Sequence, residues 1–321
     1  MAGRYGHLVR LWGVHPSQLP EKTATADELT PFLMSILLEA SPFISDVPSA
    51  KQSPFQSSWQ SVGSRSFRHS KSPVYLYERT VPVEALQSVA QEYDLPQLKG
   101  GKMHPEKWYL RRSVHEDAMT PGTASWQEWV QCFKDQHAQA EKEFTPTVLS
   151  TKVDQEWDCR GVEIDFEEET WVNWTLKVEE SVHKMPMPLK NRVFPILQAT
   201  AATREGHKVM IVQIAMRDAD TEADTSGNVR GAYTSIERLQ GTGDGIEWIM
   251  GTTSDAKGLL PAWVQHMAMP GPIAKDVDFF LSWIEKQRHS GEGGVKDEQP
   301  LGGNAPMQPG GGMGGRVAQT S

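Results

Sequence analysis

The polar side chains that could carry out chemistry gather in the second half of the sequence. His183, Tyr233 and Glu237 are able to move a proton, so they would be the acid and base groups of any enzyme. Arg192 and Arg238 are the cations that could accompany them. Because a buried charge needs a partner, we expect Glu237 to pair with Arg192 or Arg238. These residues, with His183, are candidate polar anchors for a ligand, and the alternative is an ion pair that only supports a sheet.

Motifs of known catalytic and nucleotide-binding sites are missing from the sequence. It holds no Gly-x-Ser-x-Gly, no His-Glu-x-x-His and no P-loop. Gly241-x-Gly-x-Gly lies between two expected strands rather than before a helix, which excludes a dinucleotide-binding loop. The acidic run 154–169 lacks the spaced ligands of a calcium loop, so we expect a solvated connection there. The sequence therefore predicts no catalytic residue, no metal site and no cofactor.

Composition limits the class of protein further. The 321 residues carry 32 Lys and Arg against 41 Asp and Glu, and a net charge of −9 argues against nucleic acid as a partner. The two cysteines cannot build a disulfide framework, which favours a reducing compartment, here the cytoplasm. The apolar stretches 32–38 and 209–216 are far shorter than the roughly 20 residues that span a bilayer. Eleven tryptophans predict large hydrophobic contacts, in a core or around a ligand.

The periodicity of apolar residues predicts the elements that would position the candidate residues. Helices are expected from Thr25 to Ser41, where Pro42 follows, over 83–93 and from Trp126 to about Phe144. Two early strands, 64–69 and 74–81, precede a third at 106–115. Five strands separated by short turns then follow one another over 171–182, 192–203, 208–216, 230–239 and 246–253. Short gaps of this kind are typical of hairpins, and hence of an antiparallel meander.

A long amphipathic helix is expected at the end of the ordered chain. Its apolar stripe runs through Leu260 and Trp263 and continues from Ile273 to Ile284, with a bend at Pro270-Gly271-Pro272. The order of elements predicts an α+β protein, in which a curved antiparallel β-sheet wraps on a long C-terminal α-helix. Residues 290–321 are rich in glycine and poor in apolar side chains, so we expect a disordered tail.

Several segments resemble one known family when they are taken in order. The sequence from Gly245 to Trp263 is similar to the last strand and helix start of START-like lipid-binding domains. The fuller series 180–195, 232–238, 245–263 and 273–277 resembles a fungal START-like family, the DUF3074 family, whose function is unknown. The resemblance covers roughly residues 60–288. It implies a helix-grip (START-like) fold with an internal apolar cavity, and no agreed ligand or catalytic residue.

The alternation of side chains along the strands predicts which residues would line such a cavity. Successive side chains point to opposite faces, so Phe194 and Ile196 share a face, as do Val212 and Ile214, and as do Trp248 and Met250. We expect the terminal helix to face them and expect filling of an ordinary core as the alternative. The predicted apolar ligand contacts are Phe194, Ile196, Val212, Ile214, Tyr233, Trp248, Met250, Trp263, Met267 and Val277.

These expectations combine into one functional prediction with two alternatives. The sequence predicts a helical lead-in and linker at 1–59, a START-like domain at 60–289 and the glycine-rich tail at 290–321. The domain would bind or transfer a hydrophobic small molecule, of the lipid or sterol class, without catalysis and with the terminal helix or loops as a gate. The alternatives are a polyketide-cyclase-like enzyme that uses the same cavity, and a protein-interaction module whose cavity has collapsed.

A proline-stiffened loop at 184–190 predicts a second kind of contact. It combines lysines with apolar side chains at Met187 and Leu189. Lysine near an anionic lipid surface contributes about 1 kcal/mol, so the loop is a candidate for transient contact with a membrane surface. The alternative is an ordinary turn into the next strand.

Overall fold

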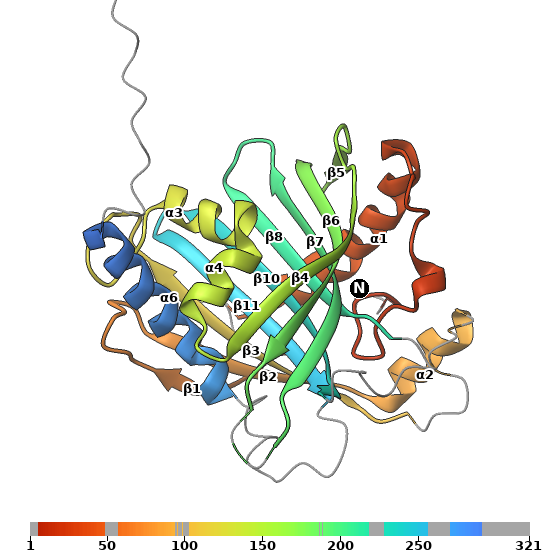
Figure 1. Ribbon diagram of the computed structural model, residues 1–321, viewed down its shortest axis with the longest axis horizontal. Coiled ribbons are helices and arrows are strands. Elements are labelled where there is room, and N and C mark those ends of the chain that lie inside the picture. The colour runs from red at the N-terminus through yellow and green to blue at the C-terminus, as the bar shows by residue number, and fades with distance from the viewer. Residues whose placement is uncertain are drawn as a thin grey trace, which may run out of the picture.

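The computed structural model describes residues 6–48, 57–93, 95, 98, 103–185, 187, 189–217, 228–255 and 270–290. A strongly curved antiparallel sheet dominates this part of the chain (Figure 1). Its strand order is β1-β2-β3-β11-β10-β8-β7-β6-β4, with β5 paired to β6 and the short β9 parallel to β7. The strands are β1 (Gln60–Arg65), β2 (Val74–Val81), β3 (Glu106–His115), β4 (Val148–Trp157), β5 (Ile164–Phe166), β6 (Glu169–His183), β7 (Arg192–Thr203), β8 (Lys208–Ala215), β9 (Val229–Arg230), β10 (Ala232–Thr242) and β11 (Gly245–Asp255).

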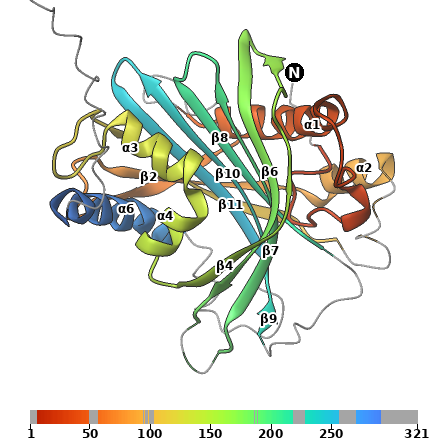
Figure 2. The same ribbon diagram turned by 45° about the horizontal axis from the view of Figure 1, so that its top comes forward.

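Helices cover both faces of the sheet. On one face lie α3 (Trp126–Val130), the π-helix η4 (Gln131–Asp135), α4 (His137–Phe144) and the C-terminal α6 (Pro270–Ser290). On the other face lie α1 (Ala26–Ser45) and α2 (Val83–Glu92), with a 3-10 turn, η1 (Pro16–Gln18), ahead of them. The turned view in Figure 2 separates α1 and α2 from the group of α3, α4 and α6. The protein is therefore α+β, with a curved antiparallel sheet around a C-terminal helix, as the sequence predicts.

Alternation along the strands divides the apolar residues into two cores. The core under α1 takes Trp108, Val212 and Ile249, whereas the core under α6 takes Ile211 and Trp248. An aromatic cluster joins α3 and α6 to the sheet on this second side. The centroid of the Trp129 ring lies 4.7 Å from that of Trp248 and 4.4 Å from that of Phe280. A large part of the tryptophan content lies in these cores. The fully buried tryptophans of the described structure are Trp59, Trp108, Trp129, Trp171 and Trp248.

Several sequence predictions about element boundaries are wrong. The first strand runs from Gln60 to Arg65 and not over 64–69, and every one of its side chains is exposed, so no buried alternation marks its position. The helix expected from Trp126 to Phe144 is interrupted by the π-helix at 131–135 and by a bend at Gln136.

Two further boundaries differ. The first helix does not end at Ser41 but continues through Pro42 to Ser45. The proline removes one helical hydrogen bond, to the carbonyl of Leu38, and the half-exposed Leu38 lies on the solvent side of the helix, where the loss is best tolerated. The acidic run 154–169 is not a plain connection, because it holds the end of β4, all of β5 and the first residue of β6. Acidic side chains occupy the solvent-facing positions of these strands.

The predicted extent of the C-terminal helix is partly described. Helix α6 begins at Pro270, with Gly271 and Pro272 in its first turn. The stripe predicted at Leu260 and Trp263 and the tail at 291–321 lie outside the described residues. The boundary predicted at residue 59 stays a prediction. Residues of the N-terminal segment, such as Leu8 and Leu29, belong to the same hydrophobic core as the sheet. Among the helices that are described, none combines the length and the apolar content that a membrane span requires.

A capping box fixes the start of α3 and, through it, the aromatic cluster. Ser125 Oγ accepts from the backbone N–H of Glu128, and Glu128 Oε2 accepts from the backbone N–H of Ser125. The Glu128 carboxylate also receives two hydrogen bonds from Arg288 on α6, at 2.6 and 2.7 Å. The cap therefore joins α3 to the far end of α6.

Removal of this cap is expected to destabilise the protein modestly. Ser125→Ala should lower the free energy of unfolding by about 1 kcal/mol, the usual cost of losing an N-cap oxygen. Chemical denaturation monitored by circular dichroism measures this value. The matched control is Ser88→Ala on the exposed face of α2, which should change stability by less than about 0.5 kcal/mol. Equal effects of the two substitutions would contradict a capping role for Ser125.

Candidate functional site

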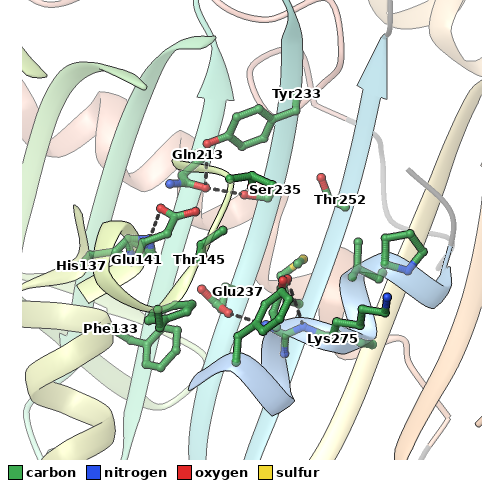
Figure 3. Close-up of a pocket in the computed structure, with 18 of the residues that line it drawn as sticks. Phe133, His137, Glu141, Thr145, Gln213, Tyr233, Ser235, Glu237, Thr252 and Lys275 are labelled. Atoms are coloured by element: carbon green, nitrogen blue, oxygen red, sulfur yellow. Dashed lines mark hydrogen bonds and ion pairs between the residues drawn. The ribbon is translucent and has the colours of Figure 1, made fainter. Parts of the chain in front are cut away.

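A cavity of about 330 Å³ lies between the sheet, α4 and the first turns of α6 (Figure 3). Strands β3, β6, β8, β10 and β11 contribute its sheet wall. The exposed Pro272 and Lys275 mark its rim at the start of α6. The lining residues are Arg111, Phe133, His137, Glu141, Phe144, Thr145, Thr147, His183, Gln213, Tyr233, Ser235, Glu237, Trp248, Met250, Thr252, Pro272, Ile273, Lys275, Asp276 and Phe279.

Part of the lining is apolar and aromatic. Phe133 comes from the π-helix and Phe144 from the end of α4, and both contact Phe280 of α6. Trp248 and Met250 follow each other on the inner face of β11. This wall is continuous with the core under α6, so its shape is fixed by packing. It offers a preformed apolar surface of the kind that small-molecule sites present.

A buried ion pair occupies the centre of the sheet wall. Arg111 Nη2 donates to Glu237 Oε1 at 3.2 Å, and the Trp248 indole N–H donates to the same oxygen. The Arg111 guanidinium lies over the Trp248 ring at 3.6 Å from its centroid. Arg111 is only 2% exposed, and burial is the main cause that raises the pKa of Glu237, against the opposing effect of Arg111. The pair is thus desolvated at the edge of the cavity.

Helix α6 adds a second carboxylate beside the same arginine. Asp276 Oδ2 lies 4.0 Å from Arg111 Nε. Burial raises the pKa of Asp276 to about 6, while Arg111 lowers it and Glu237 raises it. Arg111 therefore faces two carboxylates at once, and its charge cannot fully compensate both of them. Its Nη1 has no hydrogen-bond partner among the described residues.

Helix α4 contributes a third carboxylate, Glu141. Its Oε2 lies 3.7 Å from His137 Nε2, one helical turn away (Figure 3). Burial lowers the pKa of His137 to about 4, so the imidazole is neutral at pH 7 and does not balance the carboxylate. Burial, together with Glu237, Asp276 and Glu179, raises the pKa of Glu141 to about 8. At neutral pH Glu141 is therefore mainly a protonated carboxylic acid that can donate a hydrogen bond.

Neutral polar groups complete the wall near Tyr233. The Tyr233 hydroxyl donates to Gln213 Oε1 at 3.3 Å, and Ser235 Oγ donates to the same oxygen at 2.9 Å (Figure 3). His183 contacts Ser181 Oγ through Nε2 at 3.0 Å, and burial lowers the pKa of His183 to about 4. A small void with room for about one water molecule lies between Glu141, Tyr233 and strands β6 and β7.

The structure brings some of the candidate residues together at the cavity. Among the residues that line it are Tyr233, Trp248 and Met250, and the polar candidates His183 and Glu237. Ile196 borders the small void beyond Tyr233, and Phe194 contacts His183 and Tyr233 by ring packing at 5.0 and 5.4 Å. Trp263 and Met267 lie outside the described residues.

Other candidates lie away from the cavity. Val212 and Ile214 point into the core under α1, because their neighbour Gln213 takes the cavity face of β8. Val277 is fully buried in the aromatic core and is not among the lining residues. The prediction that Val212 and Ile214 face the terminal helix is therefore wrong. The residue of β8 that faces the cavity is Gln213, which lies between them.

The predicted partners of Glu237 are also wrong. Arg238 follows Glu237 directly in β10, so alternation turns it to the opposite face, where it pairs with Glu247 at 2.7 Å. Arg192 lies at the start of β7, where its Nη1 donates to the carbonyl of Lys190 at 3.3 Å. The partner of Glu237 is instead Arg111 on β3, which is separated from β10 by β11.

Local sequence does not indicate the remaining polar residues of the cavity. Arg111 and Asp276 lie in a predicted strand and in the predicted terminal helix, and only the tertiary structure places them together. Glu141 and His137 lie on an ordinary helix with spacing that is typical of a surface pair. Within the described residues, no group of three or more His, Cys, Asp or Glu side chains is arranged to hold a metal ion.

The fold and the cavity define the chain as a helix-grip α+β protein with a partly open, partly polar pocket. Residues 108–284 match the model of the family described as "Protein of unknown function (DUF3074)", and the chain belongs to that family. This match covers the strands and helices that form the cavity. It gives the family without a function.

Solved structures of low sequence identity are similar in outline. Human STARD10 has 12% identity and a TM-score of 0.45, over 77% of this chain and 83% of that one. Human StAR-related lipid transfer protein 5 has 12% identity and a TM-score of 0.47, over 83% and 98%. A STAR-related lipid transfer protein fragment from Xanthomonas axonopodis has 12% identity and a TM-score of 0.41, over 72% and 99%. No curated protein matches the sequence. The assignment to the family rests on the family model.

Proposed function

We propose that this protein binds one hydrophobic small molecule, of the lipid or sterol class, in the cavity and transfers it without chemical change. The observation that carries this proposal is the cavity itself: about 330 Å³, with apolar side chains from Phe133, Phe144 and Trp248 and polar groups next to them. Its volume lies at the lower end of the roughly 300–1,000 Å³ typical of small-molecule sites. The ligand's apolar body would pack on the aromatic wall, and its polar end would meet the wall of Arg111, Glu141 and Glu237.

The open cavity favours ligand binding over the interaction-module alternative, which needs a filled interior. The expected gate is the start of α6, where Pro272 and Lys275 form the exposed rim. Both cysteines are free and buried, which fits a reducing compartment such as the cytoplasm. The proposed domain that holds the cavity is residues 60–289, preceded by the lead-in at 1–59.

Gentle purification followed by solvent extraction and mass spectrometry tests this function. The proposal expects a reproducible apolar molecule in extracts of the protein, and not in extracts of an unrelated protein purified in parallel. Consistently empty protein, together with no uptake of lipids or sterols from vesicles, would contradict it.

A second candidate function, catalysis by proton transfer, is favoured by one observation. Glu141 has a pKa raised to about 8 and borders, with Tyr233, the same cavity. A carboxyl group with a pKa near the working pH is suited to general acid–base chemistry, such as a ring closure of the polyketide-cyclase kind. Recovery of the extracted ligand unchanged after prolonged incubation would exclude turnover of that ligand, whereas a product that Glu141→Gln abolishes would establish it.

Contact with a membrane surface during transfer is a further prediction of this proposal. Met187 is 93% exposed, and the same loop carries the exposed lysines Lys184 and Lys190. Met187→Asp should reduce binding to anionic liposomes about tenfold, because burial of a methionine side chain contributes roughly 1.5–3 kcal/mol. Liposome co-sedimentation measures this, with Met119→Asp, at a residue 63% exposed elsewhere, as the matched control. Unchanged binding of the Met187 variant would remove the loop from the proposal.

A further inference from the structure

The charges inside the cavity do not balance. Three carboxylates line it, Glu141 from α4, Glu237 from β10 and Asp276 from α6. The cations that line it are Arg111, which is buried, and Lys275, which is exposed at the rim. A fourth carboxylate, Glu179, is 5% exposed and borders the small void next to Glu141. Fully ionised, the interior would therefore carry an excess of negative charge.

Arg111, the buried cation among the described residues that line the cavity, already has partners. Arg111 contacts Glu237 at 3.2 Å and Asp276 at 4.0 Å and stacks on Trp248. Lys177 lies 3.7 Å from Glu179 and is not a lining residue of the cavity. Glu141 is left with the neutral His137 as its ion-pair contact within the described residues. The cavity thus presents a carboxyl group with no cation of its own beside an apolar aromatic wall.

The same surroundings make Glu141 responsive to a ligand's charge. The titratable groups around it come from every side. They are His137 on its own helix, Lys177, Glu179, Glu180 and His183 on β6, Tyr233 and Glu237 on β10, Arg111 on β3, and Asp276 and Lys275 on α6. In the free protein, burial and repulsion from Glu237, Asp276 and Glu179 keep Glu141 mainly protonated at pH 7. A cation placed next to it would reverse this preference, because an opposite charge within about 4–6 Å favours the ionised form.

From this arrangement we infer that the ligand is an amphipathic amine, whose ammonium group pairs with Glu141 while its hydrocarbon part packs on Phe133, Phe144 and Trp248. This inference rests on the proposed function and names the class of its ligand. The unpartnered Nη1 of Arg111, a residue 2% exposed, offers a donor to an oxygen on the same head group. On binding, the Glu141 carboxyl group loses its proton to solvent, and the ammonium group takes over the compensation of its charge.

The test compares three ligands with the same ten-carbon tail and different heads: decylamine, decanol and decanoic acid. Isothermal titration at pH 7 is carried out on the full chain, in two buffers of different ionisation enthalpy. Decylamine, an ammonium ion at this pH as lysine is, should bind about tenfold or more tightly than decanol, and decanoate should bind most weakly. Decylamine binding should also release close to one proton to the buffer, whereas decanol binding should release none.

Variants of one helix identify the group responsible. Glu141→Gln should weaken the binding of decylamine about tenfold, which corresponds to about 1.4 kcal/mol. It should also abolish the proton release and leave the affinity for decanol within about twofold of the wild-type value. Glu143→Gln, on the exposed side of the same helix, is the matched control and should change none of these values.

The outcomes separate the two proposals. If decanol and decylamine bind equally well and Glu141→Gln has no effect, the cavity takes apolar ligands but the inference of an amine is wrong. If decanoate binds most tightly, the inference of an amine is likewise wrong, since Arg111 would then be the group that recognises the ligand's head group. Failure of all three ligands to bind would contradict the proposed function together with this inference.

Discussion

Replacement of Arg111 by methionine is expected to destabilise the protein by about 3–5 kcal/mol, the usual cost of breaking a buried pair from one side. Arg111 is 2% exposed and is the buried cation beside Glu237 and Asp276. Without it, the buried Glu237 must take up a proton or remain unpaired, and the partly exposed Asp276 loses its nearest cation. Urea denaturation at pH 7 measures the loss.

A double variant distinguishes this effect from simple loss of packing. Arg111→Met combined with Glu237→Leu removes both members of the pair and leaves apolar side chains of similar size. Because the cost of a broken pair comes from the abandoned charge, the double variant should recover most of the lost stability. The account is contradicted if the double variant is at least as unstable as Arg111→Met alone, or if Arg111→Met costs less than about 0.5 kcal/mol.

Glu141→Gln is expected to flatten the dependence of stability on pH. The pKa of Glu141 is about 8 in the folded protein against a usual value of 4.5, so the folded state binds more protons between these values. Stability should therefore fall as pH rises from about 4.5 to about 8. Glutamine stays neutral, so the variant should equal the wild type near pH 4.5 and exceed it at pH 8.5. We expect a gain on the order of 2 kcal/mol, after a discount for screening by water in the cavity.

The shape of the two stability profiles is the decisive readout. Asp276, with its pKa raised to about 6, should leave a smaller decline between about pH 4 and 6 in both proteins. Glu143→Gln serves as the control and should follow the wild-type profile. Parallel profiles for the wild type and Glu141→Gln, separated by a constant offset, would show that Glu141 titrates normally and would refute the electrostatic description of the cavity.

Sequence patterns predict the buried strands of this protein well, for a physical reason. Strand β3 has the predicted bounds, as do β2 and β7, because β-branched and aromatic runs ended by turn residues leave little choice of register. Strand β4 was missed because Asp154 and Glu156 lie on an exposed, edge-strand surface whose composition is that of a loop. Local sequence therefore predicts the buried strands more reliably than the solvent-facing ones.

The cavity was predicted less completely, because its polar wall is assembled by tertiary structure. Trp248 and Met250 were found because alternation along one strand suffices to place them. The pairing of Glu237 required knowledge that β11 lies between β10 and β3, which brings Arg111 within 3.2 Å. Strict application of alternation would have excluded Arg238 as its partner, since adjacent strand residues face opposite sides. No local signal distinguishes Glu141 from a surface glutamate.

The most direct test of ligand binding in the cavity is native mass spectrometry of the intact protein beside a variant whose cavity is filled. Met250→Trp adds an aromatic ring inside the cavity, and Met119→Trp makes the same change at an exposed position. The account predicts a mass excess of one small apolar molecule on the wild type and on Met119→Trp, and its loss from Met250→Trp. An equal ligand load on all three proteins would place the ligand elsewhere, and no load on any of them, even after incubation with lipid vesicles, would contradict the proposed function.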